Sequence, residues 1–262
     1  MTGWPDQPMI YEINTAVWLD ELSRAAGRPV TLAGVGAADW DAAVPAGVDA
    51  VWPMGVWGRS PAGLGLANVR DHLRADLSYQ SRLMLFLDNH DDPRIASCVP
   101  ADAERAAAVA IATLPGATLW HEGQFEGRRV RPPVFLSRRP DEVPDLELGA
   151  WYRHLLAAVA DHHLRAAAWR LLEAGGWPDN QSCANLAAWS WAGDRGSDRH
   201  VVVVNLSGQA AQARIPPDLP GRSWQLTDIV GQNVFERDGG ELASPGLFVD
   251  LGPWQFHLFA LQ

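Results

Sequence analysis

A run of five polar residues, DNHDD at positions 88–92, directly follows the apolar residues 83–87. The carboxylate of Asp91 could stabilise positive charge that develops on a reacting carbon, and the imidazole of His90 could orient a hydroxyl group. The same run could instead be a polar turn that caps the helix expected from Ala101. Both interpretations predict that the chain turns sharply at this point.

A second polar group follows the apolar residues 117–120 and contains His121, Glu122 and Gln124. Glu122 and the nearby Glu126 are candidates for catalytic carboxylates, or else charges on a solvated loop. His90 and His121 could in principle ligate a metal ion. The chain has neither two histidines four residues apart nor a cysteine cluster, so we expect no metal and no cofactor.

Buried strands and amphipathic helices alternate in the first part of the chain and must position these two polar groups. This alternation is typical of parallel β-α units and predicts the α/β class. Tyr11 lies inside the first strand, so its ring either lines a binding subsite or packs against helices on the other face. We expect strands at 9–19, 48–57, 83–87 and 117–120, and helices at 38–46, 67–82, 101–114 and 145–162.

After Trp177 the pattern changes to short β-rich segments separated by Gly, Asp and Pro. Such segments favour an antiparallel β-sandwich. We therefore predict two domains, 1–170 and 171–262. The β-rich segments lie at 186–191, 199–206, 212–215, 223–228 and 247–261.

Composition excludes several classes of function. A net charge of -10 opposes binding to the phosphate backbone of nucleic acids. No apolar run reaches the roughly 18 residues of a membrane span, and the first 19 residues lack a signal-peptide pattern, so we expect a cytoplasmic protein. The 13 tryptophans could stack on sugar rings or pack in the core.

Four segments resemble, in the correct order, members of the alpha-amylase family (glycoside hydrolase family 13). Residues 9–15 (MIYEINT) and 47–57 (GVDAVWPMGVW) look like the first two barrel strands of that family. Residues 86–94 (FLDNHDDPR) are similar to its seventh-strand motif, and residues 114–124 (LPGATLWHEGQ) to its eighth strand. The β-rich C-terminal part also matches the plan of the family.

The resemblance implies roles for particular residues. In the family, the aspartate of the seventh-strand motif stabilises the transition state and the histidine binds the sugar, which makes Asp91 and His90 the expected catalytic residues. The implied substrate is an alpha-glucan, a maltooligosaccharide or a short alpha-glucoside. Expected substrate-binding residues are Asn89, Arg94, Tyr11, Trp57, His121, Glu122 and Gln124.

Three motifs of the family are missing, among them those that carry the nucleophile and the general acid/base. A retaining glycosidase needs two carboxyl groups roughly 5 Å apart, and Asp91 alone cannot do both jobs. The strands that remain resemble numbers seven, eight, one and two, which are neighbours in a closed ring. The sequence therefore predicts half of a TIM-type barrel, with four β-α units, followed by the sandwich. The family's calcium ligands lie largely in the missing region.

A half barrel leaves two strand edges open, and open edges favour pairing with another chain. We therefore expect a homodimer whose two copies could complete an eight-stranded barrel. Three functions follow from these patterns. The first is an alpha-amylase-like glycoside hydrolase with two catalytic carboxylates missing. The others are a non-catalytic carbohydrate-binding or regulatory relative, and an inactive deletion fragment.

Overall fold

The computed structural model describes residues 5, 7–54, 73–74, 77–81, 83–133, 137–193, 199–217, 219 and 221–262. Trp57 and most of the helix expected at 67–82 lie outside these residues. The contacts divide the chain into two compact units. The first unit takes residues from 1–66, 81–99 and 116–156, and the second from 67–80, 100–115 and 157–262.

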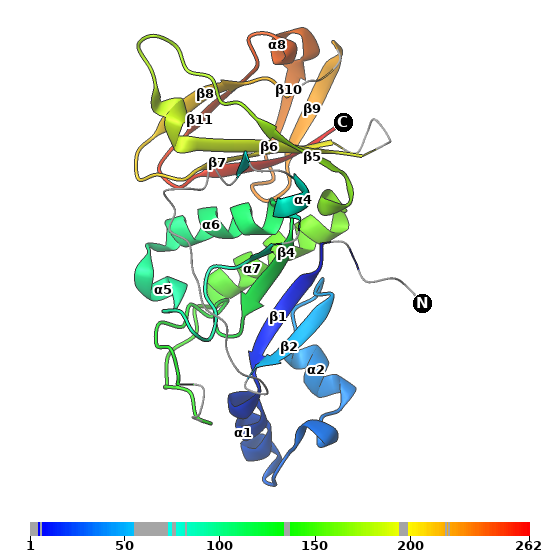
Figure 1. Cartoon of the computed structure of the whole chain (residues 1–262), viewed down its shortest axis with the longest axis vertical. Helices are drawn as coiled ribbons and strands as arrows, with labels where there is room; N and C mark the ends of the chain where they lie inside the picture. The colour runs from blue at the N-terminus through cyan, green and yellow to red at the C-terminus, as the bar shows by residue number, and fades with distance from the viewer. Residues whose placement is uncertain are drawn as a thin grey trace. The chain divides into compact units, whose positions relative to one another are not determined.

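The first unit is built on a four-stranded parallel sheet with the order β2-β1-β4-β3 (Figure 1). Its strands are β1 (Met9–Asn14), β2 (Ala50–Met54), β3 (Met84–Leu85) and β4 (Ala117–His121). The predicted neighbourhood of these four strands and their parallel direction are confirmed. Closure of the strands into half a barrel stays a prediction.

Two of the expected strands end earlier than predicted. The first stops at Asn14, not at residue 19, because the Asn14 side chain accepts a hydrogen bond from the backbone N–H of Val17 and starts helix α1 (Thr15–Ala26). Val17 and Trp18 belong to this helix and are buried. Buried apolar residues in a row are also typical of a strand, which explains the longer strand predicted from the sequence. The third strand covers only Met84–Leu85, because the chain turns at 88–92.

Among the described residues, the remaining helices of the first unit are short except for the last. They are α2 (Ala37–Ala43), α5 (Ile95–Cys98), the 3-10 helix η1 (Leu32–Gly34), and α7 (Leu146–Asp161), whose last residues belong to the second unit. The helices expected at 38–46 and 145–162 are confirmed, with ends shifted by one to three residues. An aromatic cluster holds β1, β4 and α7 together: Phe125 stacks on Tyr152 at 4.6 Å, and Trp120 contacts Tyr152 edge-on.

The second unit contains a six-stranded sheet of order β10-β9-β12-β7-β6-β5, antiparallel throughout, and a two-stranded antiparallel sheet, β11-β8. Side chains from both sheets share one apolar core. The strands are β5 (Ala168–Leu172), β6 (Leu186–Ala192), β7 (Arg199–Asn205), β8 (Ala211–Ile215), β9 (Ser223–Asp228), β10 (Val234–Asp238), β11 (Leu247–Leu251) and β12 (Phe256–Leu261).

The antiparallel class predicted for this part is confirmed. The strands β5 and β10 were not expected. The segment 247–261, expected as one β-rich stretch, forms the two strands β11 and β12. The unit also contains α4 (Leu77–Gln80), α6 (Ala101–Thr113), α8 (Gly239–Ala243), η3 (Leu164–Ala166) and η4 (Ser182–Asn185). The domain limits 1–170 and 171–262 stay a prediction, although β5 of this sheet already begins at Ala168.

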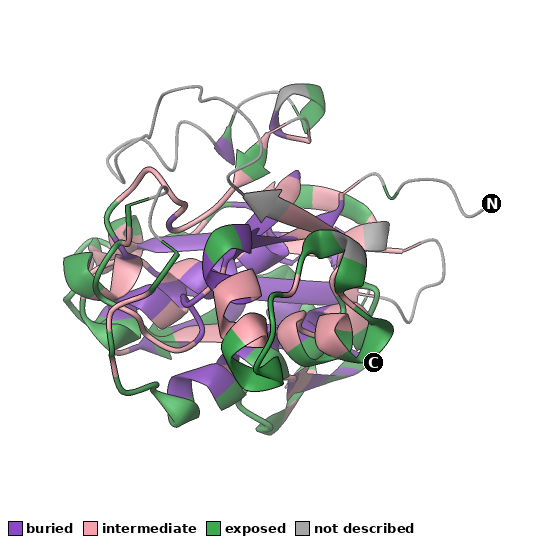
Figure 2. Cartoon of the chain, turned by 90° about the horizontal axis from the view of Figure 1, so that it is seen from below, coloured by how far each residue is buried: buried purple, intermediate pink, exposed green. Residues whose placement is uncertain are grey.

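Helix α6 packs in the second unit through two tryptophans. The indole N–H groups of Trp189 and Trp191 both donate to the backbone carbonyl of Thr113, at 3.1 and 2.7 Å. Both rings are fully buried, as are Trp120 and Trp224. These four tryptophans are therefore core residues and not sugar platforms. In Figure 2 the buried residues, in purple, run mainly along the strands. No helix of the described residues is long and apolar enough to cross a membrane.

Candidate functional site

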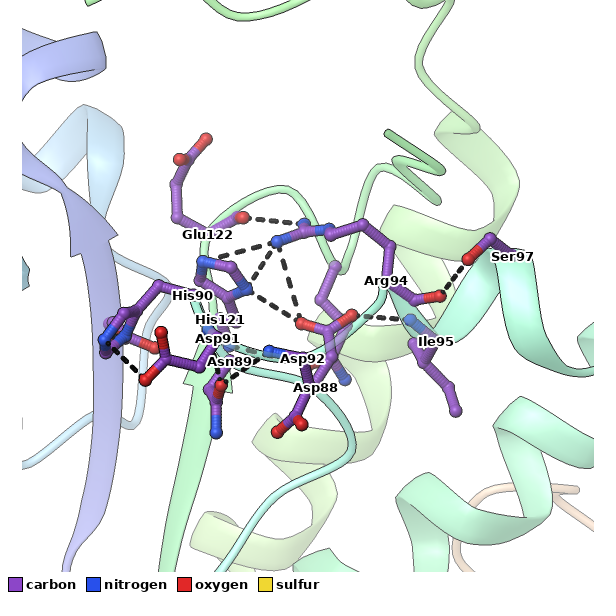
Figure 3. A network of polar contacts seen from close by, with 12 residues as sticks. Asp88, Asn89, His90, Asp91, Asp92, Arg94, Ile95, Ser97, His121 and Glu122 are labelled. Atoms are coloured by element: carbon purple, nitrogen blue, oxygen red, sulfur yellow. Dashed lines mark hydrogen bonds and ion pairs between the residues drawn. The ribbon is translucent and has the colours of Figure 1, made fainter. Parts of the chain in front are cut away.

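The polar residues that follow β3 and β4 meet at the carboxyl ends of the parallel strands (Figure 3). In parallel α/β folds this end of the sheet carries the binding site, because the loops that leave the strands converge there. The register pairs Glu12 of β1 with His121 of β4, so β1 contributes to the same place. All of these residues belong to the first unit.

A buried network of Asp88, His121 and Arg94 forms the base of the site. One Asp88 carboxylate oxygen lies 2.9 Å from Nδ1 of His121 and 3.7 Å from Nη1 of Arg94. The other accepts the backbone N–H of Ile95 at 2.7 Å and so caps α5. Arg94 also contacts the His121 ring and donates from Nη2 to the backbone carbonyl of Glu122 at 2.8 Å. All three side chains are at most 4% exposed, so they hold the loops and do not face solvent.

The loop after β4 fits closely over Arg94. Gly123 has a φ of +87°, and a Cβ at this position would lie 2.6 Å from Nη2 of Arg94. Only glycine fits without displacing the guanidinium. Gln124 is also buried, where it donates to the Tyr152 hydroxyl at 3.0 Å and accepts from the backbone of His121. The described contacts of Arg94, His121 and Gln124 are therefore those of supporting residues.

Asn89 shapes the turn that presents His90 and Asp91. Its side-chain oxygen accepts the backbone N–H groups of Asp91 and Asp92, at 2.8 and 3.0 Å. This is an Asx turn, in which the side chain replaces a backbone carbonyl. The expectation of a polar turn is therefore correct, but the helix that it caps is α5, through Asp88, and not the helix from Ala101.

His90 lies between two carboxylates. Its Nδ1–H donates to Oε1 of Glu12 at 2.6 Å, and its Nε2 lies 3.5 Å from Oδ2 of Asp91. The Glu12 side chain is fully buried, whereas those of His90 and Asp91 are 19% and 29% exposed. The rings of Trp52 and His90 lie nearly perpendicular to each other, with their centres 6.1 Å apart. Solvent or a ligand can thus reach His90 and Asp91, and the neighbouring Asn89 and Asp92 are partly exposed as well.

Sequence reasoning missed Glu12 and Asp88 as site residues. Among the described residues, the second oxygen of Glu12, Oε2, is buried and accepts no hydrogen bond. A carboxylate in such a position is costly unless it serves a neighbour or a ligand. The signal was present in the sequence, since Glu12 is the one charged residue in the apolar strand β1.

Glu122 points its carboxylate away from the buried network (Figure 3). Arg139 holds it, with Nη1 2.5 Å from Oε1 of Glu122, and also binds Glu21 at 2.6 Å. Burial alone would lower the pKa of Arg139, but the two glutamates outweigh this effect and raise it. Glu122 is therefore half of an ion pair and not a solvated loop charge.

Tyr11 lies on the opposite face of β1 from Glu12, with its ring 6.1 Å from that of Phe125. Successive side chains of a strand alternate between faces, so Tyr11 points away from His90 and lines a pocket with the side chains of Glu122 and Arg139. Burial raises the pKa of Tyr11 well above its usual range, and Glu122 and Glu126 add to this effect. The structure thus brings together Asn89, His90, Asp91, Arg94, His121, Gln124 and the backbone of Glu122, whereas Tyr11 lies with the Glu122 side chain, and Trp57 lies outside the described residues. Among the residues described, no group of three or more His, Cys, Asp or Glu could hold a metal ion.

Comparison with known proteins connects the fold to one group of enzymes. A scan against protein-family models and a search of curated proteins found no match. Solved structures with a similar fold include a maltogenic alpha-amylase from Thermotoga neapolitana (TM-score 0.54, 14% identity) and an alpha-amylase from Geobacillus thermoleovorans (TM-score 0.54, 17% identity). A trehalose-6-phosphate hydrolase from Bacillus licheniformis is also similar (TM-score 0.52, 15% identity).

These matches cover 67%, 70% and 77% of this chain, respectively. The chain spans only 40%, 39% and 48% of the length of those proteins. At this level of identity the similarity shows a shared fold, and the activities of the enzymes remain their own.

Proposed function

We propose that this protein binds alpha-glucans or short alpha-glucosides at the His90–Asp91 cluster, as a carbohydrate-binding protein with an alpha-amylase-like fold. One observation carries the proposal: His90 and Asp91 are partly exposed, and the network of Asp88, His121 and Arg94 beside them is buried and fixed. A carboxylate and an imidazole nitrogen can each bind a sugar hydroxyl, and a rigid base keeps them in position for it.

The same geometry favours binding over hydrolysis. Glycosidases use two carboxyl groups roughly 5 Å apart when retaining and roughly 6.5–9.5 Å apart when inverting, and both must reach the substrate. Among the described residues at this site, Asp88 and Glu12 are buried and Glu122 is paired with Arg139. Asp91 and Asp92 are both partly exposed, but the Asp92 carboxylate points away from His90 and Asp91 (Figure 3), so the described part of the site offers no pair of carboxylates around one substrate.

The second candidate function is hydrolysis of alpha-glucans or alpha-glucosides. It is favoured by Glu12, a second carboxylate that contacts the opposite ring nitrogen of the same His90. If His90 moved, Glu12 and Asp91 would face a common space. An inactive deletion fragment would neither bind nor hydrolyse sugars.

We further propose that the parallel sheet is half of a barrel and that two copies of the chain pair through its edges. Among the described residues, no strand pairs with the outer edge of β2 or β3. Met84, in β3, is 39% exposed. An apolar strand edge of this kind is a favourable surface for pairing between chains.

One experiment separates these functions. Maltoheptaose is titrated calorimetrically into the full chain, and release of reducing sugar is measured in the same solution. Asp91→Asn is the test variant, and Asp92→Asn is the matched control with the same charge change on the same turn. Binding without turnover that depends on Asp91 supports the first function. Turnover that Asp91→Asn abolishes supports the second.

A further inference from the structure

Phe248 of the two-stranded sheet β11-β8 forms an aromatic pair with Trp177, which lies outside the sheet in the turn that ends at Asn180. Trp177 and Phe248 lie with their ring centres 6.4 Å apart and their planes 40° apart, and Phe248 is 41% exposed. Phe248 sits opposite Arg214 across the two strands, and the guanidinium lies 4.9 Å from the centre of the Phe248 ring. These side chains line an open groove of about 730 Å³, which is within the usual range for small-ligand sites.

Two backbone hydrogen bonds hold the turn that begins at Trp177. The N–H of Trp177 donates to the carbonyl of Asn180 at 3.1 Å, and the N–H of Asn180 donates back to Trp177 at 2.8 Å. Gly176 makes this turn possible, since a Cβ there would lie 2.4 Å from the Asn180 carbonyl oxygen. The aromatic pair is therefore a preformed surface, and a ligand would not need to order it.

Polar side chains adjoin the aromatic pair on the same face. Gln212 lies two residues before Arg214 in β8, and Asp250 lies two residues after Phe248 in β11, so all four side chains share one face. Gln212 donates to Asp250 at 2.9 Å and accepts from the Asn180 amide at 2.9 Å. The groove thus combines flat apolar rings with amide and carboxylate groups at its border.

Two features of the groove indicate which kind of ligand fits it. An extended peptide cannot add to β8 beside Arg214, because Gly175 already exchanges both backbone hydrogen bonds with Arg214 at 2.9 Å. The charged groups at the groove are also balanced, with Arg214 3.8 Å from Glu241 and Glu173 3.7 Å from Arg74. A neutral ligand with flat apolar faces and hydroxyl groups along its edges fits this surface.

We propose that the groove at Trp177 and Phe248 is a binding site for a neutral oligosaccharide, separate from the His90–Asp91 cluster. A pyranose ring would stack on the aromatic pair, and its hydroxyl groups would bond to the Arg214, Gln212 and Asp250 side chains. The groove lies within the second unit and His90 and Asp91 within the first, so this proposal does not depend on the function proposed above.

The test uses the full chain with Asp91→Asn, so that binding at the first cluster is weakened. Maltoheptaose and cellohexaose are titrated calorimetrically, because the groove chemistry suits either glucan. We expect saturable binding of at least one of them. Trp177→Ala and Phe248→Ala should each weaken it about tenfold or more, and Trp177→Phe should largely preserve it.

The matched control is Trp254→Ala, which removes a half-buried tryptophan elsewhere in the same unit and should leave the affinity unchanged. Circular dichroism and the unfolding midpoint establish that each variant is folded. If Trp177→Ala fails to fold, Phe248→Ala and Arg214→Ala decide in its place, and Arg214→Ala should also weaken binding. Absence of saturable binding for both sugars, or equal affinity in Phe248→Ala and its parent, would overturn the proposal.

Discussion

At the scale of single residues, the site depends on a carboxylate that faces no solvent. Glu12 is fully buried and accepts a hydrogen bond from His90 at 2.6 Å, which fixes the ring and turns Nε2 towards Asp91. The motif at 88–92 was predictable from its polarity and its position after an apolar strand. The role of Glu12 was not, because contact between residues 78 positions apart depends on the register of the sheet.

Replacing Glu12 by Ala should disturb both stability and binding. The Nδ1–H of His90 would lose its acceptor, so we expect the free energy of unfolding to fall by about 1–3 kcal/mol. Affinity for maltoheptaose should fall about tenfold, because the ring of His90 is no longer held. Urea unfolding and calorimetry measure the two effects. Glu12→Gln, which keeps an acceptor oxygen, should lie between the wild type and Ala, and a binding affinity unaffected by Glu12→Ala would refute the supporting role.

Gly123 should tolerate no side chain. A Cβ at this position would lie 2.6 Å from Arg94, and the φ of +87° disfavours any other residue. Gly123→Ala should therefore lower the free energy of unfolding by about 1–3 kcal/mol, as measured by urea unfolding. Gly221→Ala is the control, since its Cβ would meet open space. Equal stability of the two variants would contradict the close fit of the loop over Arg94.

At the scale of elements, strand β1 connects the site to the core. One face presents Glu12 to His90, and the other presents Tyr11 to Phe125. The parallel order of the four strands and the helices α2, α6 and α7 were predictable from the alternation of apolar and amphipathic segments, whereas α1 and α5 were not. The change from strand to helix at Asn14 was not predictable, because the buried residues Val17 and Trp18 would fit a buried strand as well as a buried helix. Strands β5 and β10 were missed because they bury too little apolar surface to stand out in the sequence: all residues of β10, and all but Leu172 of β5, are partly or fully exposed.

The burial of Tyr11 should appear in the pH dependence of stability. Its pKa is raised in the folded state, so the folded protein keeps the phenol proton above about pH 10 while the unfolded chain loses it. The stabilising contribution is complete below about pH 10 and is lost as the pH rises towards the folded pKa, by up to about 1.4 kcal/mol per pH unit.

Urea unfolding between pH 8 and pH 11 measures this effect, with Tyr11→Phe as the comparison. The wild type should lose stability more steeply than Tyr11→Phe above about pH 10, and the two slopes should agree below it. Parallel curves over the whole range would mean that Tyr11 titrates in the folded state as it does in the unfolded chain.

At the scale of the whole molecule, the proposed half barrel predicts self-association. Light scattering should give twice the 28.5 kDa mass of one chain. Met84→Lys places a charge on the edge strand β3 and should shift the equilibrium to the monomer. Leu32→Lys, at a residue of similar exposure (40%) outside the sheet, should leave the dimer intact. A monomeric wild type at micromolar concentration would contradict the pairing of two half barrels.

The central claim is that His90 and Asp91 bind an alpha-glucan, and calorimetric titration with maltoheptaose tests it most directly. We predict saturable binding to the wild type and to Asp92→Asn, and affinity at least about tenfold weaker for Asp91→Asn, because the Asp91 carboxylate is the partly exposed acceptor that faces His90. Equal affinity of Asp91→Asn and the wild type would contradict the claim, and so would the absence of binding to the wild type.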